Sequence, residues 1–596
     1  MNFIKKYWHW LLVPVILGVM FVTMYFSSKG DSAIVDEIAH IPSGYSYITT
    51  GDYRLNPEHP PLIKDLAAIP LLFTKVTFPY DYWMNNLPVI NNQWEMGWRF
   101  LYQTPGNNPD AMLMATHIPM MILSMLLGLL VFFWAKNLFG PKAGIFALTL
   151  YAFDASILAH SRFVTTDLGI SLALFLNIFA LYYYLKKPSV KRMALAAVTF
   201  FIAFVTKFSV AILAPVYLII FAMLLFRKGT ETKTNLLNGI FNEDWRKRFA
   251  SALTAFAIIC VSGVMMMWAF YFFHTMNMPA QVQKDLIYES MPKNIVSDTL
   301  AGMSDNPALK PLAQWLLGFS MVAGHVEGGH DAFLLGMTSN KGWWYYYPVT
   351  IALKTAIPVF IFLLLWLLFR KKLQKLDWFS EVYLWVLPLV LLVMGMQGSI
   401  NLGIRYMLPV FPFLYVALSR VVDLIDFKSL FEKAKRNTTT VLTTLVMLAL
   451  IAWYVGGSLM TYPHYLSYFN EFVGGSKNGY KYLTDSNLDW GQDVKRLANW
   501  IKESDKSKEH KCQFQTYVDV FPGSMPAAYY IGRDRMIEWH VQNGRPTGCF
   551  AISATFYQNS KMKKGANGGM DYAWLDGETP IDNIGGSILI YDLNKR

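Results

Sequence analysis

The chain has 596 residues, of which 54% are hydrophobic, 16% aromatic and only 15% charged, and its formal net charge is +12. Soluble proteins carry about 25% charged residues, so this composition excludes an ordinary soluble enzyme and indicates an α-helical polytopic membrane protein. The basic residues form short clusters between apolar runs and no single basic face, so no nucleic-acid partner is expected.

The first apolar run follows Lys5 and Lys6 and has no small-residue cleavage site after it, which predicts an uncleaved first span. Further runs of spanning length recur as far as residue 460, so the sequence predicts about eleven spans. These predicted spans are 8–27, 111–135, 143–160, 168–185, 191–208, 209–226, 250–273, 346–369, 381–397, 403–419 and 439–460.

A cytoplasmic N-terminus predicts basic residues in alternate loops. The predicted inner loops contain Lys136 and Lys142; Lys186, Lys187, Lys191 and Arg192; Arg227, Lys228, Arg246, Lys247 and Arg248; Arg370, Lys371, Lys372 and Lys375; and Lys428, Lys433, Lys435 and Arg436. Because every inner loop is basic, an odd number of spans is consistent and the C-terminus is expected outside. We therefore expect a multi-pass protein of the plasma (inner) membrane, surrounded by membrane lipids.

This topology predicts two domains, a transmembrane domain at 1–460 and an extracytoplasmic domain at 461–596. Two long outer loops are expected within the first domain, at about 28–110 and about 274–345. The first loop contains its own apolar piece, PLIKDLAAIPLLF, which is too short to span and suits the membrane interface.

The polar C-terminal tail mixes helix and strand patterns and predicts a small α/β domain. The segment QDVKRLANWIKES predicts an amphipathic helix, and CFAISATFY and SILIYDL predict strands. The apolar face of the helix consists of Val494, Leu497, Ala498 and Ile501. An extracytoplasmic tail would permit a disulfide between Cys512 and Cys549, which the sequence leaves open.

Two adjacent carboxylates, Asp36 and Glu37, follow the first span in a segment that holds few other charges. Ionisable groups at membrane depth are costly and usually functional, but acidic residues also favour the first turn of a helix. Downstream, NPEHPPLIK contains prolines that stiffen the backbone around His59 and Lys64. Such rigidity suits a site loop and a plain turn equally well, so both interpretations stay open.

Three cations are placed at the outer face, against the usual bias of basic residues toward the cytoplasm. They are Arg162 in SRFVTTDLG, together with Asp167, Lys207 in FVTKFS and Arg405 in NLGIRYMLPVFPF. Lipid phosphates of the bilayer are the general partner for such cations. A specific bound phosphate is the sharper alternative, because Arg offers bidentate oxygen recognition and Lys a point charge.

Two further motifs carry metal-ligand residue types at unsuitable spacings. GHVEGGH at 324–330 lacks the spacing of the zinc-protease helix and contains helix-breaking glycines. DSNLDWGQD at 485–493 resembles a calcium loop, but its glycine is displaced and Arg496 stands where the final glutamate belongs. No metal site is expected, and no nucleotide-binding glycine loop is present.

The segment VDEIAHIPSGYSYITTGDYRLNPEHPPLIKDLAAIPLL resembles the first extracytoplasmic loop of GT-C superfamily glycosyltransferases, in the branch of protein O-mannosyltransferases and lipid A aminoarabinose transferases. An Asp-Glu pair followed by a His-Pro-Pro-Leu-x-Lys-like motif marks that branch. SRFVTTDLGI, GWWYYYPVTIALKTAIP, GIRYMLPVFPFLYV and YPHYLSYFNEFVGGSKNGYKYLTDSNLDWGQDVKRL are similar to its phospholipid-carrier-dependent members. The likeness covers most of the membrane part and the start of the tail.

The resemblance implies an inverting glycosyltransferase that moves a sugar from a polyprenyl-phosphate donor to an extracytoplasmic acceptor, which is a protein, a lipid or an envelope glycan. The implied catalytic residues are Asp36, the general base, and Glu37, which positions the site. The residues implied to bind the donor phosphate are Arg162, Lys207 and Arg405, and those implied to frame the pocket are His59, Lys64 and Asp167. Since phosphate leaves as an anion, fixed cations can stabilise it, and neither a cofactor nor a divalent metal is expected.

Two alternatives differ in function class. An oligosaccharide transferase or ligase would carry a Trp-Trp-Asp type of tail motif, for which LDWGQD is no match. A membrane transporter would show symmetric halves and helices broken at the midplane, whereas this chain concentrates its polar residues in asymmetric outer loops. The loop at about 274–345 is too short for the β-trefoil insert of eukaryotic O-mannosyltransferases, so a protein acceptor does not follow.

Overall fold

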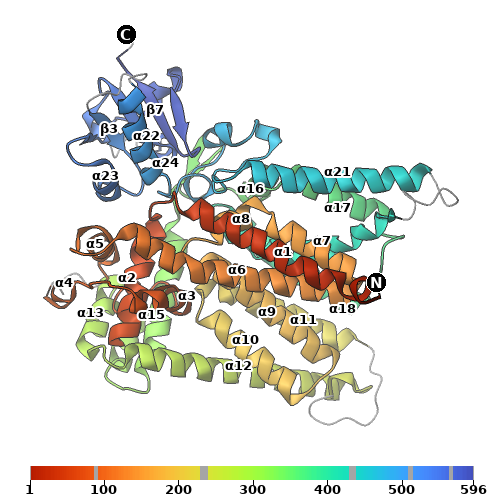
Figure 1. Cartoon of the computed structure of the whole chain (residues 1–596). Helices are drawn as coiled ribbons and strands as arrows, with labels where there is room; N and C mark the ends of the chain where they lie inside the picture. The colour runs from red at the N-terminus through yellow and green to blue at the C-terminus, as the bar shows by residue number, and fades with distance from the viewer. Residues whose placement is uncertain are drawn as a thin grey trace.

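The computed structural model describes residues 2–85, 91–227, 239–427, 438–507, 515–562 and 568–594. Figure 1 shows a bundle of long helices that lie roughly side by side, with a smaller sheet-containing region, drawn in blue, at one end. The short helices of the two long loops gather at this same end, opposite the N-terminus. We call this the loop end of the bundle.

Seven helices within the described ranges are long and apolar enough to cross a membrane. They are α1 (Asn2–Ser28), α6 (Pro109–Phe139), α9 (Thr166–Lys186), the segment Phe208–Phe226 that contains α11 (Leu213–Phe226), α12 (Trp245–Thr275), α18 (Trp378–Gln397) and α21 (Thr438–Met460). An eighth span results if α16 (Tyr346–Lys354) and α17 (Ile357–Phe369), which meet at 106°, are counted together. The polytopic helical class is thus confirmed, with seven or eight candidate spans.

The prediction of about eleven spans is not confirmed, because three predicted segments form shorter helices. Segment 143–160 is divided by Asp154, whose carboxylate caps a second helix by accepting a hydrogen bond from the Ile157 amide at 2.8 Å. In 191–208, the helix ends before Lys207, whose backbone is extended. In 403–419, Pro409 separates a 3₁₀ turn from a nine-residue helix. The helices concerned are α7 (Pro141–Ala152), α8 (Ala155–His160), α10 (Val190–Phe204) and α19 (Val410–Leu418).

Large aromatic side chains fill the core of the bundle. The fully buried Trp134 of α6 contacts Phe175 of α9 and Phe413 of α19, with ring centroids 5.1 and 5.8 Å apart. Aromatic side chains each bury a large apolar area and pack edge to face, so this cluster fixes the three helices relative to one another.

The first long loop folds into short helices against the bundle. These helices are α2 (Val35–Thr50), α3 (Leu62–Ala68), α4 (Tyr80–Asn85) and α5 (Gln93–Trp98). A Cβ on Gly44 would lie 2.1 Å from the Lys64 carbonyl oxygen, and a Cβ on Gly97 would lie 1.8 Å from that of Ile38. Glycine is therefore required at both positions for α3 and α5 to pack directly on α2.

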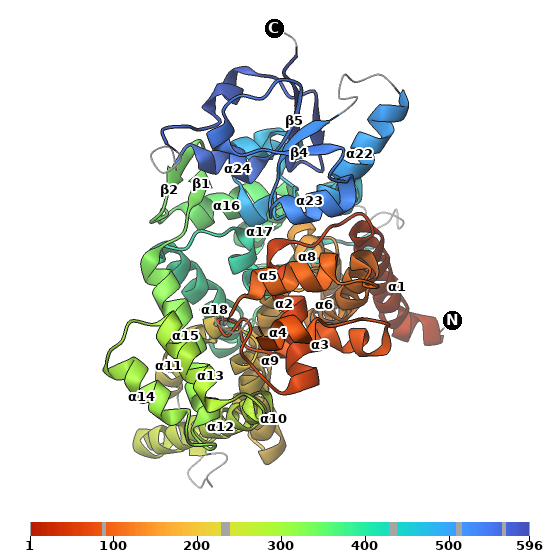
Figure 2. The ribbon, with the colours of Figure 1, turned by 90° about the vertical axis from the view of Figure 1, so that its left-hand side faces the viewer.

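The remaining loop residues complete the loop end. The apolar piece after α3 ends in Leu72 and Phe73, which are exposed, and its place at the membrane interface stays a prediction. The second loop forms α13 (Ala280–Ser290), α14 (Ile295–Met303), α15 (Lys310–Gly328) and the hairpin of β1 (Ala332–Leu334) and β2 (Met337–Ser339). Figure 2, viewed onto the loop end, shows both sets of helices below the sheet region.

The C-terminal region contains a five-stranded mixed sheet in the order β4-β3-β5-β7-β6. Its strands are β3 (Thr516–Asp519), β4 (Met536–Glu538), β5 (Cys549–Ser553), β6 (Asp582–Ile584) and β7 (Ile588–Asp592). Strand β3 is parallel to β4 and β5, whereas β7 is antiparallel to β5 and β6. Helices α22 (Val494–Ser507), α23 (Ser524–Ile531) and α24 (Ala554–Ser560) accompany it, which confirms the predicted α/β region.

One detail of the tail prediction is confirmed and another is wrong in part. The apolar face predicted for α22 is buried in the core under the sheet, as expected. The segment CFAISATFY is strand only as far as Ser553, because α24 begins at Ala554. Cys549 begins β5, and Cys512 lies outside the described residues.

Candidate active site

The acidic pair lies at the start of α2, where the two carboxylates point in different directions. Glu37 is fully buried, and its carboxylate accepts hydrogen bonds from the Ile34 amide at 3.0 Å and the Val164 amide at 2.9 Å. Its other contact is the His117 imidazole of α6, at 2.6 Å. Glu37 therefore caps α2 and ties it to two neighbouring segments, as expected of an acid in a first helical turn.

Asp36 lies on the other side of the helix and remains accessible. Its Oδ2 is 2.8 Å from Nη1 of Arg405, and the side chain of Asp36 is 20% exposed, compared with 0% for that of Glu37. Arg405 belongs to the 3₁₀ turn that precedes α19, and its guanidinium stacks 4.3 Å from the centre of the Trp490 ring. The pair thus joins residues 369 positions apart in the chain.

Two further charged groups extend this ion pair into a chain of four. Asp167, in the first turn of α9, lies 3.5 Å from Arg405 through Oδ2 and 2.5 Å from Lys207 through Oδ1. The Lys207 ammonium lies 4.6 Å from the centre of the Tyr406 ring. We call Asp36, Arg405, Asp167 and Lys207 the central cluster; its two carboxylates and two cations balance in formal charge.

Two histidines border the central cluster. The rings of His40 and His59 meet edge to face with centroids 5.1 Å apart, and Nδ1 of His40 lies 2.7 Å from the Val164 carbonyl oxygen. Burial holds the pKa of His59 well below its ordinary value, and the neighbouring cations, among them Lys207 and Arg405, lower it further. Burial also lowers the pKa of His40. Both rings are therefore neutral at neutral pH and line the site without adding charge.

Lys64 occupies a closed position behind His59. It is fully buried, and its ammonium donates hydrogen bonds to the carbonyl oxygens of His59 at 2.7 Å and Asn56 at 2.9 Å, and to the Tyr47 hydroxyl at 3.1 Å. Burial holds the pKa of Lys64 well below its ordinary value. The lysine thus holds the NPEHPPLIK turn together and does not reach the central cluster.

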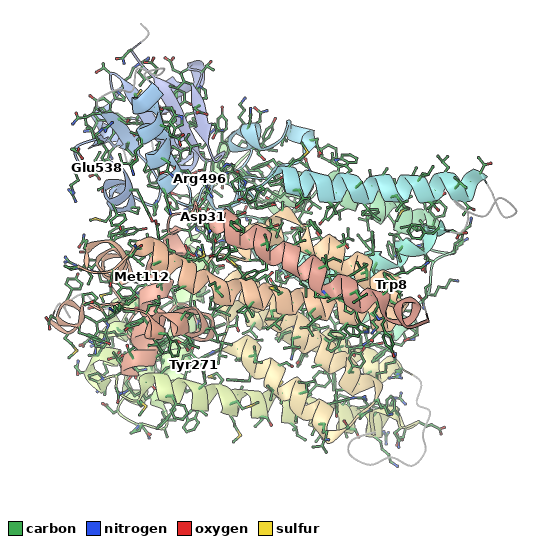
Figure 3. All side chains as sticks on the ribbon, viewed as in Figure 1. Trp8, Asp31, Met112, Tyr271, Arg496 and Glu538 are labelled. Carbon is green, nitrogen blue, oxygen red and sulfur yellow. The ribbon has the colours of Figure 1, made fainter. Side chains whose placement is uncertain are left out.

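Arg162 is likewise enclosed, and its partner is a carboxylate of the protein itself. Its Nε lies 2.6 Å from Asp31, and both side chains are at most 1% exposed. Arg496 of α22 binds the other oxygen of Asp31 at 2.8 Å and Asp493 at 2.6 Å. We call Asp31, Arg162, Arg496 and Asp493 the closed cluster. Figure 3 labels Asp31 and Arg496 at the junction of the bundle with the C-terminal region.

The predicted site residues therefore fall into two groups. The structure brings together Asp36, Asp167, Lys207, Arg405 and, beside them, His59. It places Glu37, Lys64 and Arg162 in enclosed positions where protein groups already satisfy them. The roles assigned to all eight stay predictions. Chemically, the first group offers an accessible carboxylate beside two cations, which suits proton abstraction next to a bound anion.

The sequence of the chain matches one family in its membrane part. Residues 110–268 match the family described as dolichyl-phosphate-mannose-protein mannosyltransferase. This match covers part of the membrane region, and the resemblance expected from the first loop is confirmed by it. No curated protein matches the chain in sequence.

Several solved structures are similar to this chain. ArnT from Cupriavidus metallidurans in the apo state has 12% sequence identity and a TM-score of 0.47, with 98% of each chain covered. The same protein bound to undecaprenyl phosphate has 11% identity and a TM-score of 0.46, covering 98% of this chain and 97% of that chain. The archaeal oligosaccharyltransferase AglB from Archaeoglobus fulgidus, in complex with an inhibitory peptide and a dolichol-phosphate, has 13% identity and a TM-score of 0.46, covering 94% and 71%.

Sequence reasoning missed several groups that shape this site. His117 lies within a predicted span, and an ionisable residue at that depth is a signal that could have marked it. Asp31 was visible between the first span and the acidic pair, but nothing local reveals that it neutralises Arg162. Trp490 lies in the tail motif DSNLDWGQD, and its stacking on Arg405 has no local sequence signal.

The metal-like motif DSNLDWGQD makes contacts within the protein. Among the described residues, no group of three or more His, Cys, Asp or Glu side chains is arranged to hold a metal ion. In DSNLDWGQD, Asp489 accepts hydrogen bonds from the Ser553 hydroxyl and the Thr555 amide, and Asp493 accepts one from Ser587. These carboxylates join the motif to the sheet.

Proposed function

We propose that this chain is an inverting glycosyltransferase that moves a sugar from a polyprenyl phosphate to an acceptor hydroxyl outside the cytoplasm, with Asp36 as the general base. The observation that carries the proposal is the ion pair between Asp36 and Arg405 at 2.8 Å, within a cluster that also holds Lys207. A base that acts on one side of the sugar and cations that hold a phosphate on the other are the two requirements of such a displacement.

In the free enzyme, the cations of the central cluster are neutralised by its carboxylates. The phosphodiester of a polyprenyl-phosphate sugar competes for Arg405 and Lys207 as a further anion. Arg405 then turns from Asp36 toward the phosphate, which leaves Asp36 free to accept a proton. Binding of the donor thereby prepares the base, and the site does not hold an unpaired carboxylate while it is empty.

The chemical step is a single displacement. The acceptor oxygen attacks the anomeric carbon opposite the phosphate while Asp36 takes the hydroxyl proton. The bond from the anomeric carbon to the phosphate oxygen breaks, and its electron pair remains on the leaving phosphate. The phosphate gains negative charge during this step, so the fixed charges of Arg405 and Lys207 stabilise the transition state more than the bound donor.

The enclosed residues take positioning roles in this proposal. Glu37 sets the start of α2 through its bonds to Ile34 and Val164, and so aims Asp36. Lys64 holds the turn that carries His59. Arg162, expected from the sequence to bind phosphate, supports the site instead through its pair with Asp31, five residues before Asp36.

The orientation proposed for the chain places the loop end and the C-terminal region outside the cytoplasm. Support comes from the basic residues of the predicted inner loops, since positively charged loops are retained on the cytoplasmic side. This side also suits the donor, because a lipid-linked sugar is available where nucleotide sugars are not.

The decisive experiment measures sugar release from a labelled polyprenyl-phosphate sugar by the purified full chain, together with mass spectrometry of cell-envelope glycans with and without the protein. We expect turnover of the donor and the loss of one glycan modification. Absence of both would refute the proposal.

We also expect full activity in the presence of EDTA, because Arg405 and Lys207 already supply positive charge to the leaving phosphate. The measurement is the initial rate of transfer with EDTA and after addition of Mg²⁺ or Mn²⁺. A strict requirement for a divalent ion would instead favour an oligosaccharide transferase.

A further inference from the structure

A cavity of about 850 Å³ lies between the C-terminal sheet and the two long loops. Its wall includes Val518 and Asp519 at the end of β3, Glu538 at the end of β4 and Thr555 just after β5. The carboxyl ends of these three parallel strands therefore open into one space, which is where open α/β sheets bind their ligands. Further lining residues come from α5 and from residues 329–340.

The cavity adjoins the central cluster through Asp485. This residue lines the cavity and lies within electrostatic range of Arg405, which pairs with Asp36. Its backbone has a left-handed φ of 56°, and its amide donates a hydrogen bond to the Thr555 hydroxyl at 3.1 Å. Asp485 thus links the cavity to the central cluster through Arg405.

The lining has a definite chemical character. Its carboxylates are Glu95, Asp331, Asp485, Asp519 and Glu538, and its rings are Trp98, Phe521, Phe556, Tyr572, His330 and His540. No Lys or Arg lines it, as far as the described parts of the chain go. Some carboxylates have protein partners, such as Asp519, which accepts from the Tyr572 hydroxyl at 2.6 Å. A carboxylate offers about four lone-pair positions on its two oxygens, so one partner in the protein does not prevent it from accepting a further hydrogen bond.

This lining disfavours an anionic ligand and favours a hydroxyl-rich one. A phosphorylated headgroup would meet several carboxylates and, among the described lining residues, no Lys or Arg, so this lining disfavours it. A sugar ring, in contrast, has hydroxyls that donate to carboxylates and a flat C–H face that packs on aromatic rings. The T-shaped pair of Phe521 and Phe556, with centroids 5.5 Å apart, offers such a surface.

We infer that this cavity binds the acceptor, and that the acceptor is a glycan without negative charge whose receiving hydroxyl is delivered past Asp485 to Asp36. The inference rests on the proposed function and adds to it the acceptor class and the place where that acceptor binds. At the loop end, the bundle then binds the donor and the sheet region selects the acceptor.

The test uses the full chain in lipid nanodiscs and a polyprenyl-phosphate donor with a radiolabelled sugar. Two variants alter the cavity: Ser524→Trp adds bulk at its wall, and Phe556→Ala removes an aromatic face. Ile581→Ala is the matched control, because Ile581 is a 38% exposed apolar residue of the same region that does not line the cavity. Thermal unfolding of each variant verifies that it is folded.

Three readouts separate this inference from the proposed function. They are hydrolysis of the donor by water, transfer of label to a phosphate-free oligosaccharide fraction of the cell envelope, and transfer to phosphorylated glycolipids or to Ser/Thr-containing peptides. We expect both cavity variants to lower transfer to the neutral fraction about 10-fold or more with donor hydrolysis unchanged, and Ile581→Ala to behave as wild type.

Unchanged transfer by folded Ser524→Trp and Phe556→Ala would overturn the cavity assignment. Label appearing mainly in phosphorylated glycolipid or in peptide would overturn the acceptor class. A wild-type chain that does not turn over the donor at all would refute the proposed function itself, which is a different and distinguishable result.

Discussion

The central and closed clusters contain the same kinds of side chain, lie near the same end of the bundle and begin only five residues apart, at Asp36 and Asp31. Their surroundings differ. The pairs of the closed cluster link Asp31 at 0% exposure with Arg162 at 1%, whereas Asp36 of the central cluster is 20% exposed. Burial alone would raise the pKa of Asp31, but Arg162 and Arg496 hold it below its ordinary value. The closed cluster is thus a structural set of ion pairs.

The central cluster is instead arranged to exchange partners. Arg405 lies between two carboxylates, at 2.8 and 3.5 Å, and its Nε has no hydrogen-bond partner among the described residues. A cation that already interacts with two anions loses little interaction energy when a third anion replaces one of them. Arg496 of the closed cluster also binds two carboxylates, so the accessibility of the carboxylate, and not the type of residue, separates the proposed anion site from a structural ion pair.

The largest effect is expected at the base. Asp36→Asn keeps the size of the side chain but removes its ability to take a proton, so transfer should fall by about 10²–10⁴-fold, the usual contribution of a general base. The measurement is sugar transfer by purified protein, with expression and thermal unfolding as checks of folding. Near-normal turnover by folded Asp36→Asn would mean that the central cluster is not catalytic.

The next effect tests whether Arg405 binds phosphate. Arg405→Gln should lower kcat/KM for the donor by about 100-fold, because one fixed charge toward the leaving group is lost. Arg420→Gln is the matched control, since Arg420 pairs with Glu381 at 2.5 Å and its side chain is only 5% exposed. Equal losses of kcat/KM in the two variants would assign Arg405 a purely structural role. The central cluster would then not differ from the closed cluster.

The closed cluster should respond in stability and not in donor affinity. Arg162→Met leaves the buried carboxylate of Asp31 with one partner fewer, which should cost about 3–5 kcal/mol of unfolding free energy. The double variant Asp31→Asn with Arg162→Met should recover part of this loss, because the buried charge is then removed. KM for the donor should stay unchanged in the folded fraction. A raised KM in folded protein would place Arg162 at the phosphate and join the two clusters.

The smallest effect concerns the pH dependence of stability at Asp489, which joins the DSNLDWGQD motif to the sheet. Burial raises the pKa of Asp489 to about 7, well above its unfolded value of about 3.9. The folded state therefore holds a proton that the unfolded state releases, so its stability falls as pH rises from about 4 to 7. Asp489→Asn should remove this part of the pH dependence of stability. The Tm of the variant relative to that of wild type should therefore be about 3 °C higher at pH 8 than at pH 5. Parallel unfolding curves of the two proteins across this range would contradict the assignment.

Hydropathy alone predicted the class of protein and most of its membrane helices, because the bilayer demands long apolar segments. It overestimated the number of long spans where a polar residue interrupts an apolar run, as Asp154 does between α7 and α8. The strands of the tail were recognised from their apolar pattern, and the end of β5 was missed because SATFY is equally compatible with strand and helix.

The candidate site was only partly predictable. Topology and the family resemblance placed Asp36, Lys207 and Arg405 on one face, and the structure brings them together. The same reasoning placed Arg162 there and ranked it above Lys207 and Arg405 as a phosphate-binding residue. What separates Arg162 from Arg405 is the identity of the nearest carboxylate, and these partners lie 131 and 369 residues away in the chain. Pairings at such separations follow from the fold and leave no local pattern.

Contacts between the start of the first loop and the segment just before α22 join parts of the chain that are synthesised at different times. Ser32 donates a hydrogen bond to the Gly491 carbonyl oxygen, 459 residues later, and Trp490 covers Arg405. During synthesis the acidic pair emerges first, and its surroundings are complete only once the last quarter of the chain has been made.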